Sequence, residues 1–457
     1  MFRIKIQKAE NRWSFFICML ICLGLSLTGC GGGGSDGTAG AQNSGSTSQN
    51  KEATSDGWEK REIMQLNASG MLIPNVQTAY DGESTVHMAY FTDSLNDSSG
   101  FTVNHVSFTL PDMTEGIPGE VIDIDNCRTL GLTLGTGKTP VVVYQGGQIR
   151  ECGAEQQSDV MMNTGSANTW TEVTAGIGYV ERNPVFQDGL AGRRVTAAAD
   201  SNGDIHVAYQ FFYEGCDAMN FNYPDLLYVR KQGSNPEAEA AEETVEGNIY
   251  NPNGTASAQN NVGEHARLIL DQDQDPAIFY YADLSPNNSD PDQKGLRVAR
   301  KKGETWTHEW IEIGIQVGAI SAALDRNGNL AVAYYVESEY TDSLGSHEKL
   351  LKYAVQRNSV WNKMIVDESV QCGNFCSLSF AADGNPAIAY YAMQNHSGST
   401  SLQDLKYASY NGSAWDIETV SSEGDIGHDN SLWFDQTGTA YICSYSETLH
   451  TIFLFYR

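Results

Sequence analysis

The chain has 457 residues, of which 40% are hydrophobic and 19% charged. This apolar content is sufficient for a packed core, and disorder along the whole chain is excluded. The formal net charge of −29 argues against a nucleic-acid-binding protein and against a polybasic membrane-surface anchor, since both need a basic face. The 45 glycines and 22 tyrosines favour an all-β fold with many tight turns.

Residues 1–29 have the pattern of an export signal. Four basic residues, Arg3, Lys5, Lys8 and Arg12, precede an apolar run over residues 13–27. This run is too short to span a membrane comfortably and is typical of a signal peptide. An uncleaved transmembrane anchor is an alternative interpretation.

The apolar run ends in Leu27-Thr28-Gly29-Cys30, which resembles the bacterial lipobox. The resemblance implies cleavage before Cys30, acylation of Cys30 and attachment to a membrane through the lipid. Gly31 rather than Asp follows, which in this family implies the outer membrane of a diderm bacterium. An ordinary secretory signal with a chance cysteine is the other alternative. Either cleavage removes four bases and one acid, so the charge falls from −29 to −32.

Residues 30–56 are rich in Gly, Ser, Thr, Asn and Gln, a composition typical of a flexible tether. We expect the folded domain to cover residues 57–457 and to be a monomer.

A pattern of about 54 residues recurs along this domain. It consists of an alternating apolar strand, a turn rich in Asp, Gly and Asn, a strand ending in Tyr, a variable loop, a third strand and a fourth strand led by Trp. Its clearest copies begin at residues 320 and 376. The strand-end positions are Tyr90, Tyr144, Tyr209, Tyr280, Tyr334, Tyr390 and, in the last copy, Ser444.

Seven copies of a four-stranded unit predict a seven-bladed β-propeller. The last copy ends near residue 457 without its Trp-led strand, whereas residues 57–63 align with residues 414–420. We therefore expect the N-terminal strand to complete the last blade and close the ring, which removes exposed sheet edges. A tandem of β-sandwiches is the alternative.

The repeats resemble a large bacterial family with an Asp-Gly-Asn turn, an Ala-Tyr-Tyr strand end and a Leu-Lys-Tyr-Ala strand before Trp. These are similar to sialidase-like and lectin-like propellers, which implies the fold and says little about activity. Gly303–Trp306 matches the end of a sialidase box, but Ala299 and Lys301 replace its Ser and Asp. Arg193, Arg194 and Arg267 are too few to predict an arginine triad with certainty, and the net negative charge opposes an anionic sugar.

Long loops between the second and third strands lie on one face of the expected ring, and variable loops on a rigid scaffold often bind ligands. The candidate ligand-binding residues on this face are Asp93, Tyr213, Glu214, Asp217, Asp283, Glu337, Tyr340, His347 and His396. Acids and aromatic rings suit a sugar, a cation or a basic protein segment.

No catalytic residue, cofactor or metal site is predicted. Asp271, Asp273 and Asp275 are interpreted as a turn, because Pro276 and Ala282 stand where a calcium loop needs Gly and Glu. His87 and His206 share one strand position, which favours packing.

Six cysteines remain after Cys30, and an even number in an exported protein permits disulfides. Cys127 with Cys152 is the first predicted pair, and Cys372 and Cys376 are close enough in sequence to form a second, local pair. Cys443 lies within a strand and is expected to be a buried thiol.

The leading hypothesis is a lipid-anchored, non-enzymatic propeller that binds a carbohydrate or a protein through its long-loop face. One alternative is a periplasmic scaffold, by analogy with the propeller lipoprotein of the outer-membrane barrel insertion machine. The other is a glycosidase or a lyase.

Overall fold

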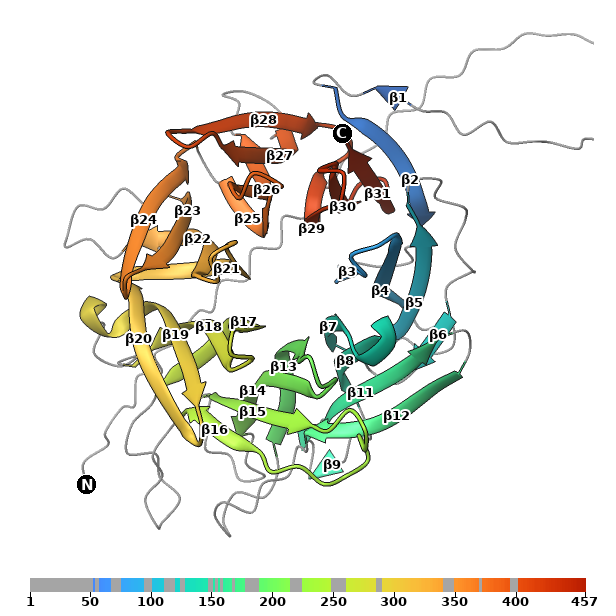
Figure 1. Ribbon diagram of the computed structural model, residues 1–457, viewed down its shortest axis with the longest axis vertical. Coiled ribbons are helices and arrows are strands. Elements are labelled where there is room, and N and C mark those ends of the chain that lie inside the picture. Colours follow the sequence, from blue (N-terminus) through green and yellow to red (C-terminus); the bar gives the residue numbers. More distant parts are fainter. Residues whose placement is uncertain are drawn as a thin grey trace, which may run out of the picture. The chain divides into compact units, whose positions relative to one another are not determined.

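The computed structural model describes residues 52–53, 57–66, 75–93, 101–110, 120–123, 128–146, 151–152, 155–156, 159–166, 169–176, 189–213, 224–247, 260–284, 290–339, 349–369, 372–394 and 402–457. All of them belong to one structural unit, Asn50–Arg457. Within this unit, seven antiparallel sheets stand around a common axis (Figure 1). The predicted seven-bladed β-propeller is thus confirmed. Among the described residues, none forms a helix long and apolar enough to cross a membrane.

The first three blades follow the chain order from the inner to the outer strand. Blade 1 consists of β3 (Gln77–Tyr80), β4 (Thr85–Asp93), β5 (Phe101–Thr109) and β6 (Glu120–Asp123). Blade 2 consists of β7 (Arg128–Leu134), β8 (Pro140–Gly146), β11 (Asp159–Ser166) and β12 (Thr169–Gly176). Blade 3 consists of β13 (Gly189–Ala199), β14 (Ile205–Tyr213), β15 (Asp225–Lys231) and β16 (Glu243–Glu246).

The next three blades keep this order. Blade 4 consists of β17 (Asn261–Leu270), β18 (Pro276–Asp283), β19 (Lys294–Lys302) and β20 (Thr305–Ile313). Blade 5 consists of β21 (Ile315–Leu324), β22 (Leu330–Glu339), β23 (Leu350–Arg357) and β24 (Val360–Asp367). Blade 6 consists of β25 (Cys372–Phe380), β26 (Pro386–Gln394), β27 (Leu402–Tyr410) and β28 (Trp415–Ser421).

Blade 7 combines both ends of the domain. Its strands β29 (Ile426–Phe434), β30 (Ala440–Ser446) and β31 (Thr451–Tyr456) are followed by β2 (Glu59–Gln65) and the short β1 (Glu52–Ala53). In this sheet β2 lies antiparallel to β31, with Glu59 opposite Tyr456. The remaining elements are the hairpin β9 (Glu151–Cys152) and β10 (Glu155–Gln156), and two 3-10 turns, η1 (Thr136–Lys138) and η2 (Pro291–Gln293).

The aspartates of the repeat close the short turns between the first and second strands. One carboxylate oxygen of Asp325 accepts hydrogen bonds from the amides of Asn327 and Asn329, both at 2.8 Å. Asp271 does the same for Asp273 and Asp275, both at 2.9 Å. Because a short acidic side chain can satisfy backbone donors two and four residues ahead, Asp is favoured here. Residues 271–275 form the expected turn.

The core consists of seven apolar clusters, each between neighbouring blades. Of the strand-end tyrosines, five are fully buried and Tyr90 is 4% exposed. Ser444, which replaces tyrosine in blade 7, is also fully buried. His87 and His206 are buried too, as expected for packed histidines. Burial between sheets therefore accounts for the most regular feature of the repeat.

Candidate functional site

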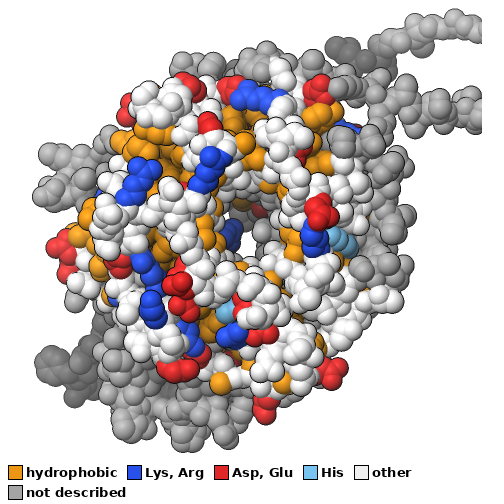
Figure 2. Space-filling view, viewed as in Figure 1, with side chains coloured by type: hydrophobic (Ala, Val, Ile, Leu, Met, Phe, Trp, Pro, Cys, Tyr) orange, Lys and Arg blue, Asp and Glu red, His pale blue; other side chains and the backbone are white. Residues whose placement is uncertain are grey.

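A cavity of about 580 Å³ lies on the ring axis, where the inner strands of all seven blades meet. Figure 2 shows the centre of the molecule hollowed, with basic side chains inside the opening. Most of the lining residues lie near the middle of the inner strands, so the cavity is part of the central channel.

A bulge in the inner strands turns side chains into this cavity. In β13, β17, β25 and β29 the pairing with the second strand shifts register twice near the strand start. The bulged residues Arg194, His265, Phe375 and Asp429 have φ between 49° and 55°. Such left-handed conformations are uncommon for residues other than glycine and often mark functional positions. All four line the cavity.

A glycine two residues before each of three bulges brings the inner strand close to the preceding blade. A Cβ at Gly263 would lie 2.9 Å from Cγ of Gln210, and one at Gly373 would lie 2.9 Å from Cβ of Leu351. Gly427 approaches Tyr391 in the same way, at 3.1 Å from its Cδ2. These glycines let each strand approach its neighbour closely before it bulges toward the axis.

Positive charge gathers on one side of the cavity. Arg194 of β13 and Arg267 of β17 are exposed to solvent within the channel. His265 also lines the cavity and precedes Arg267 by two residues in β17. Burial, reinforced by the charges of Arg194 and Arg267, lowers the pKa of His265 to about 3. The imidazole is therefore neutral at pH 7, and two guanidinium groups supply the positive charge. Guanidinium groups favour carboxylate, sulfate and phosphate as partners.

Blade 7 adds an acid and an amide group to the cavity, and its Asp429 is near enough to Arg267 for their charges to attract each other. Oδ2 of Asp429 accepts a hydrogen bond from the amide of Val76 at 3.1 Å, while burial raises the pKa of Asp429 to about 6. The side-chain amide nitrogen of Asn430 donates to the carbonyls of Phe375, at 3.1 Å, and Gly427, at 2.7 Å. Its buried Oδ1 has no hydrogen-bond partner. A ligand with a hydroxyl group could satisfy this acceptor.

Aromatic side chains complete the wall. Phe91, Phe101 and Phe375 line the cavity together with serines of the inner strands. Two of these serines already bind the next blade: Ser321 Oγ accepts from the amide of Leu378, and Ser377 Oγ from that of Leu432, both at 2.9 Å. The cavity thus combines apolar rings, polar groups and two cations, a set suited to a polar ligand with an anionic group.

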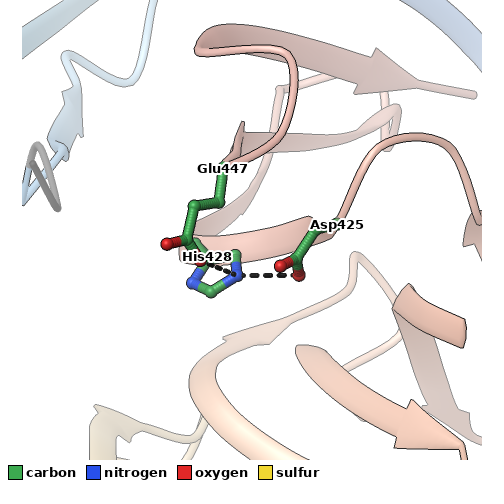
Figure 3. A group of neighbouring side chains, drawn as sticks. All are labelled: Asp425, His428 and Glu447. Atoms are coloured by element: carbon green, nitrogen blue, oxygen red, sulfur yellow. Dashed lines mark hydrogen bonds and ion pairs between the residues drawn. The ribbon is translucent and has the colours of Figure 1, made fainter. Parts of the chain in front are cut away.

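A second cluster lies beside the cavity, at the start of β29 and the end of β30. Figure 3 shows Asp425, His428 and Glu447 pointing toward one another. Nε2 of His428 is 3.0 Å from Oδ1 of Asp425 and 3.6 Å from Oε2 of Glu447. Phe375, a cavity residue, packs against the His428 ring with centroids 4.9 Å apart. The two sites therefore share a wall.

The predicted loop residues do not form this cavity. Asp283 is buried and pairs with Lys294 at 2.9 Å, and Glu337 accepts a hydrogen bond from Gln316 at 2.9 Å. Neither lines the cavity. Asp93 and Tyr213 end β4 and β14, but their side chains lie outside the described residues. So do Cys30, Glu214, Asp217, Tyr340, His347 and His396 as a whole.

The local disulfide between Cys372 and Cys376 is not seen, which corrects the prediction. Both are buried free thiols, and Cys443 is one as well, as expected. Cys372 and Cys376 lie in the single strand β25. Cys127 and the side chain of Cys152 lie outside the described residues.

One sequence signal could have revealed the cavity residues. Gly263, Gly373 and Gly427 each precede a bulged residue by two positions, and Gly192 stands at the same distance before Arg194. Strand alternation alone does not predict these inward positions, because it assigns inward and outward residues only in a strand without bulges.

Comparisons with known proteins add structural neighbours of low sequence identity. No family model and no curated protein matches the chain. The polysaccharide lyase Uly1 matches with a TM-score of 0.49 and 11% identity, over 86% of this chain and 92% of the lyase. An α-L-arabinanase of Penicillium chrysogenum matches with a TM-score of 0.46 and 8% identity, over 87% of this chain and 97% of the arabinanase. A protein of unknown function from Dyadobacter fermentans matches with a TM-score of 0.45 and 12% identity, over 79% and 100% of the two chains. We therefore argue function from the cavity itself.

Proposed function

We propose that this protein is a lipid-anchored, extracytoplasmic binding module that takes a carbohydrate with an anionic group into its central cavity. The supporting observation is the pair of guanidinium groups, Arg194 and Arg267, in a cavity of about 580 Å³ that also holds aromatic rings. A volume of that size suits a small saccharide. The long-loop face then provides the entrance, and no chemical step is assigned to the module.

The two arginines of the cavity, Arg194 and Arg267, offset the repulsion of an anionic sugar that the net charge predicts. A net charge of −29 opposes an anionic sugar at long range. Exposed charges are screened beyond about 8 Å at physiological salt. A sugar carboxylate or sulfate inside the cavity therefore responds mainly to Arg194 and Arg267 at close range.

A glycan array tests the proposal. The purified full chain is applied to neutral, uronate-containing and sulfated glycans, and we expect binding to anionic glycans. Arg267→Gln and Arg194→Gln should each weaken binding roughly tenfold or more, since a charge-assisted hydrogen bond contributes about 1.5–3 kcal/mol.

Arg357→Gln is the matched control, because Arg357 is an exposed arginine at the end of β23 outside the cavity lining. It should leave affinity unchanged. Equal loss in all three variants, or absence of glycan binding, would contradict the proposal. A change in the mass of the glycan during incubation would show that the protein cleaves it, and would contradict a function in binding alone.

A further inference from the structure

We propose that Asp425, His428 and Glu447 form a binding site for one divalent metal ion that prefers mixed nitrogen and oxygen ligands, as Zn²⁺ does. The proposal does not depend on the saccharide-binding function. It rests on the mutual geometry of the three side chains, on the groups that hold them in place and on their charge.

The three ligand atoms already surround a common point. Nε2 of His428 lies 3.0 Å from Asp425 Oδ1 and 3.6 Å from Glu447 Oε2, and one atom from each residue lies within 4.8 Å of the others. Ligands about 2.0–2.1 Å from a tetrahedral Zn²⁺ are roughly 3.3–3.4 Å apart. The two measured distances lie on either side of that value. Small rotations of the side chains would therefore suffice to coordinate a metal.

Hydrogen bonding alone explains the arrangement less well. Both carboxylates approach the same ring nitrogen, which can carry only one proton. At 3.0 Å Asp425 can accept it, whereas at 3.6 Å Glu447 is beyond hydrogen-bond distance. A metal ion at this point uses the Nε2 lone pair and both carboxylates at once.

Backbone contacts fix the segments that carry the ligands. The amide of Glu447 donates to the carbonyl of Asp425 at 3.0 Å, and the amide of Thr448 donates to that of Gly424 at 3.3 Å. The hydroxyl of Ser446 also donates to the Gly424 carbonyl. The start of β29 and the end of β30 are thus joined directly at the site.

Neighbouring rings orient the ligands. Tyr391 donates a hydrogen bond from its hydroxyl to Asp425 Oδ1 at 3.2 Å. The His428 ring lies 4.7 Å from the Tyr391 ring and 4.9 Å from the Phe375 ring, measured between centroids. Hydrogen bonds to a ligating carboxylate and packing around a ligating imidazole preorganise metal sites in this way.

Charge and exposure also fit a metal. Two carboxylates face one imidazole, so a dipositive ion would neutralise the cluster. The side chains of His428 and Asp425 are 11% and 14% exposed, whereas that of Glu447 is 53% exposed. Three protein ligands with one open side leave a position for water or for an oxygen of a ligand.

The test is titration of the purified, chelator-treated full chain with ZnCl₂ in a calorimeter, without any saccharide. We expect one Zn²⁺ per chain. His428→Gln and Glu447→Gln should each weaken Zn²⁺ binding at least tenfold. Glu447→Gln is the decisive variant, because the Glu447 side chain is 53% exposed and packs little against the core, and circular dichroism verifies the fold.

Asp273→Asn is the matched control. Asp273 belongs to the other acidic cluster, in which Asp271 already accepts hydrogen bonds from the turn amides and histidine is lacking. This variant should bind Zn²⁺ as the unchanged chain does. Absence of Zn²⁺ binding, or Zn²⁺ binding that both His428→Gln and Glu447→Gln leave intact, would overturn the proposal. Either result leaves the glycan-binding test unaffected.

Discussion

Buried tyrosine hydroxyls join neighbouring blades through carboxylates. Tyr390 donates to Asp367 of the preceding blade at 2.6 Å, and Lys406, opposite Tyr390 in its own sheet, lies 3.9 Å from the same carboxylate. Two other blade interfaces repeat this arrangement. Their members are Tyr280, Glu246 and Arg297, and Tyr334, Glu312 and Lys352. Each set compensates the charge that it buries, as a buried carboxylate requires.

The carboxylate of Asp367 should make stability depend on acid pH. Burial by itself would raise the pKa of Asp367, but hydrogen bonds from Ser369 and Tyr390, together with Lys406, hold this pKa below its usual value of 3.8. A lowered pKa in the folded state means that the ionised group stabilises the fold above pH 3.8. That contribution is lost as the pH falls through the folded-state pKa.

Asp367→Asn should therefore lower the unfolding midpoint most at pH 6–7, and the difference from the unchanged chain should shrink below about pH 4. Denaturant titrations from pH 3 to pH 7 measure it. Glu304→Gln, at an exposed turn position, serves as the control and should change little throughout. A difference that stays constant with pH would show that the ionised form of Asp367 is not the stabilising species.

Some of these residue roles follow from the sequence, and others do not. The regular spacing of Tyr280, Tyr334 and Tyr390 predicts burial, because identical places in a repeat usually share packing. Their carboxylate partners come from the preceding blade, so spacing within one repeat does not identify them. The sequence singles out Arg194 as a possible partner of an anionic sugar, but it does not place Asp429 in the cavity. A bulge changes which face of the strand a residue occupies, so simple strand alternation does not locate Asp429.

At the scale of the strand, a tryptophan links each of five outer strands to the preceding blade. In every case its ring meets an aromatic ring edge-on, with planes 67–84° apart. Trp58, which precedes β2, meets Tyr407 with centroids 5.3 Å apart, just as Trp415, which begins β28, meets Tyr353 at 5.6 Å. The remaining pairs are Trp170 with His105, Trp306 with Tyr228 and Trp361 with Phe279.

Residues 57–63 therefore occupy in blade 7 the place that residues 414–420 occupy in blade 6, in agreement with their alignment in sequence. Trp58 is fully buried, donates from Nε1 to Glu418 at 3.2 Å and lies under the guanidinium of Arg457, 4.8 Å from its ring. One tryptophan thus contacts residues of blade 6 and the last residue of the chain. The N-terminal segment has the contacts of an outer strand.

Trp58→Ala tests whether the N-terminal strand holds the ring closed. Removing a buried tryptophan should cost about 3–5 kcal/mol of stability. Amide exchange should accelerate in β2 and β31. The matched variant Trp361→Ala removes the same kind of edge contact and should accelerate exchange in β24 instead. Unchanged exchange in β2 and β31 of Trp58→Ala would mean that this tryptophan does not secure the closure.

At the scale of the whole molecule, the proposed lipid anchor at Cys30 is consistent with the charge of the rest of the chain. After cleavage before Cys30 the charge would be −32, and a strongly acidic protein is repelled by anionic lipid headgroups. Electrostatic adsorption therefore cannot hold the domain at a membrane. Acyl chains can, since each buried CH₂ contributes about 0.8 kcal/mol and two or more chains give stable anchoring.

Cys30→Ser should therefore move the protein from the membrane fraction to the soluble fraction of the producing bacterium, while a high-salt wash of membranes should leave the unchanged chain in place. Salt screens ionic attraction but does not weaken the burial of acyl chains. Cys22→Ser is the matched control, because Cys22 lies within the apolar run and would be removed with the predicted signal. This variant should remain in the membrane fraction. Release of the unchanged chain by salt, or retention of Cys30→Ser, would contradict lipid anchoring at Cys30, and the binding module would then need another route to the cell envelope.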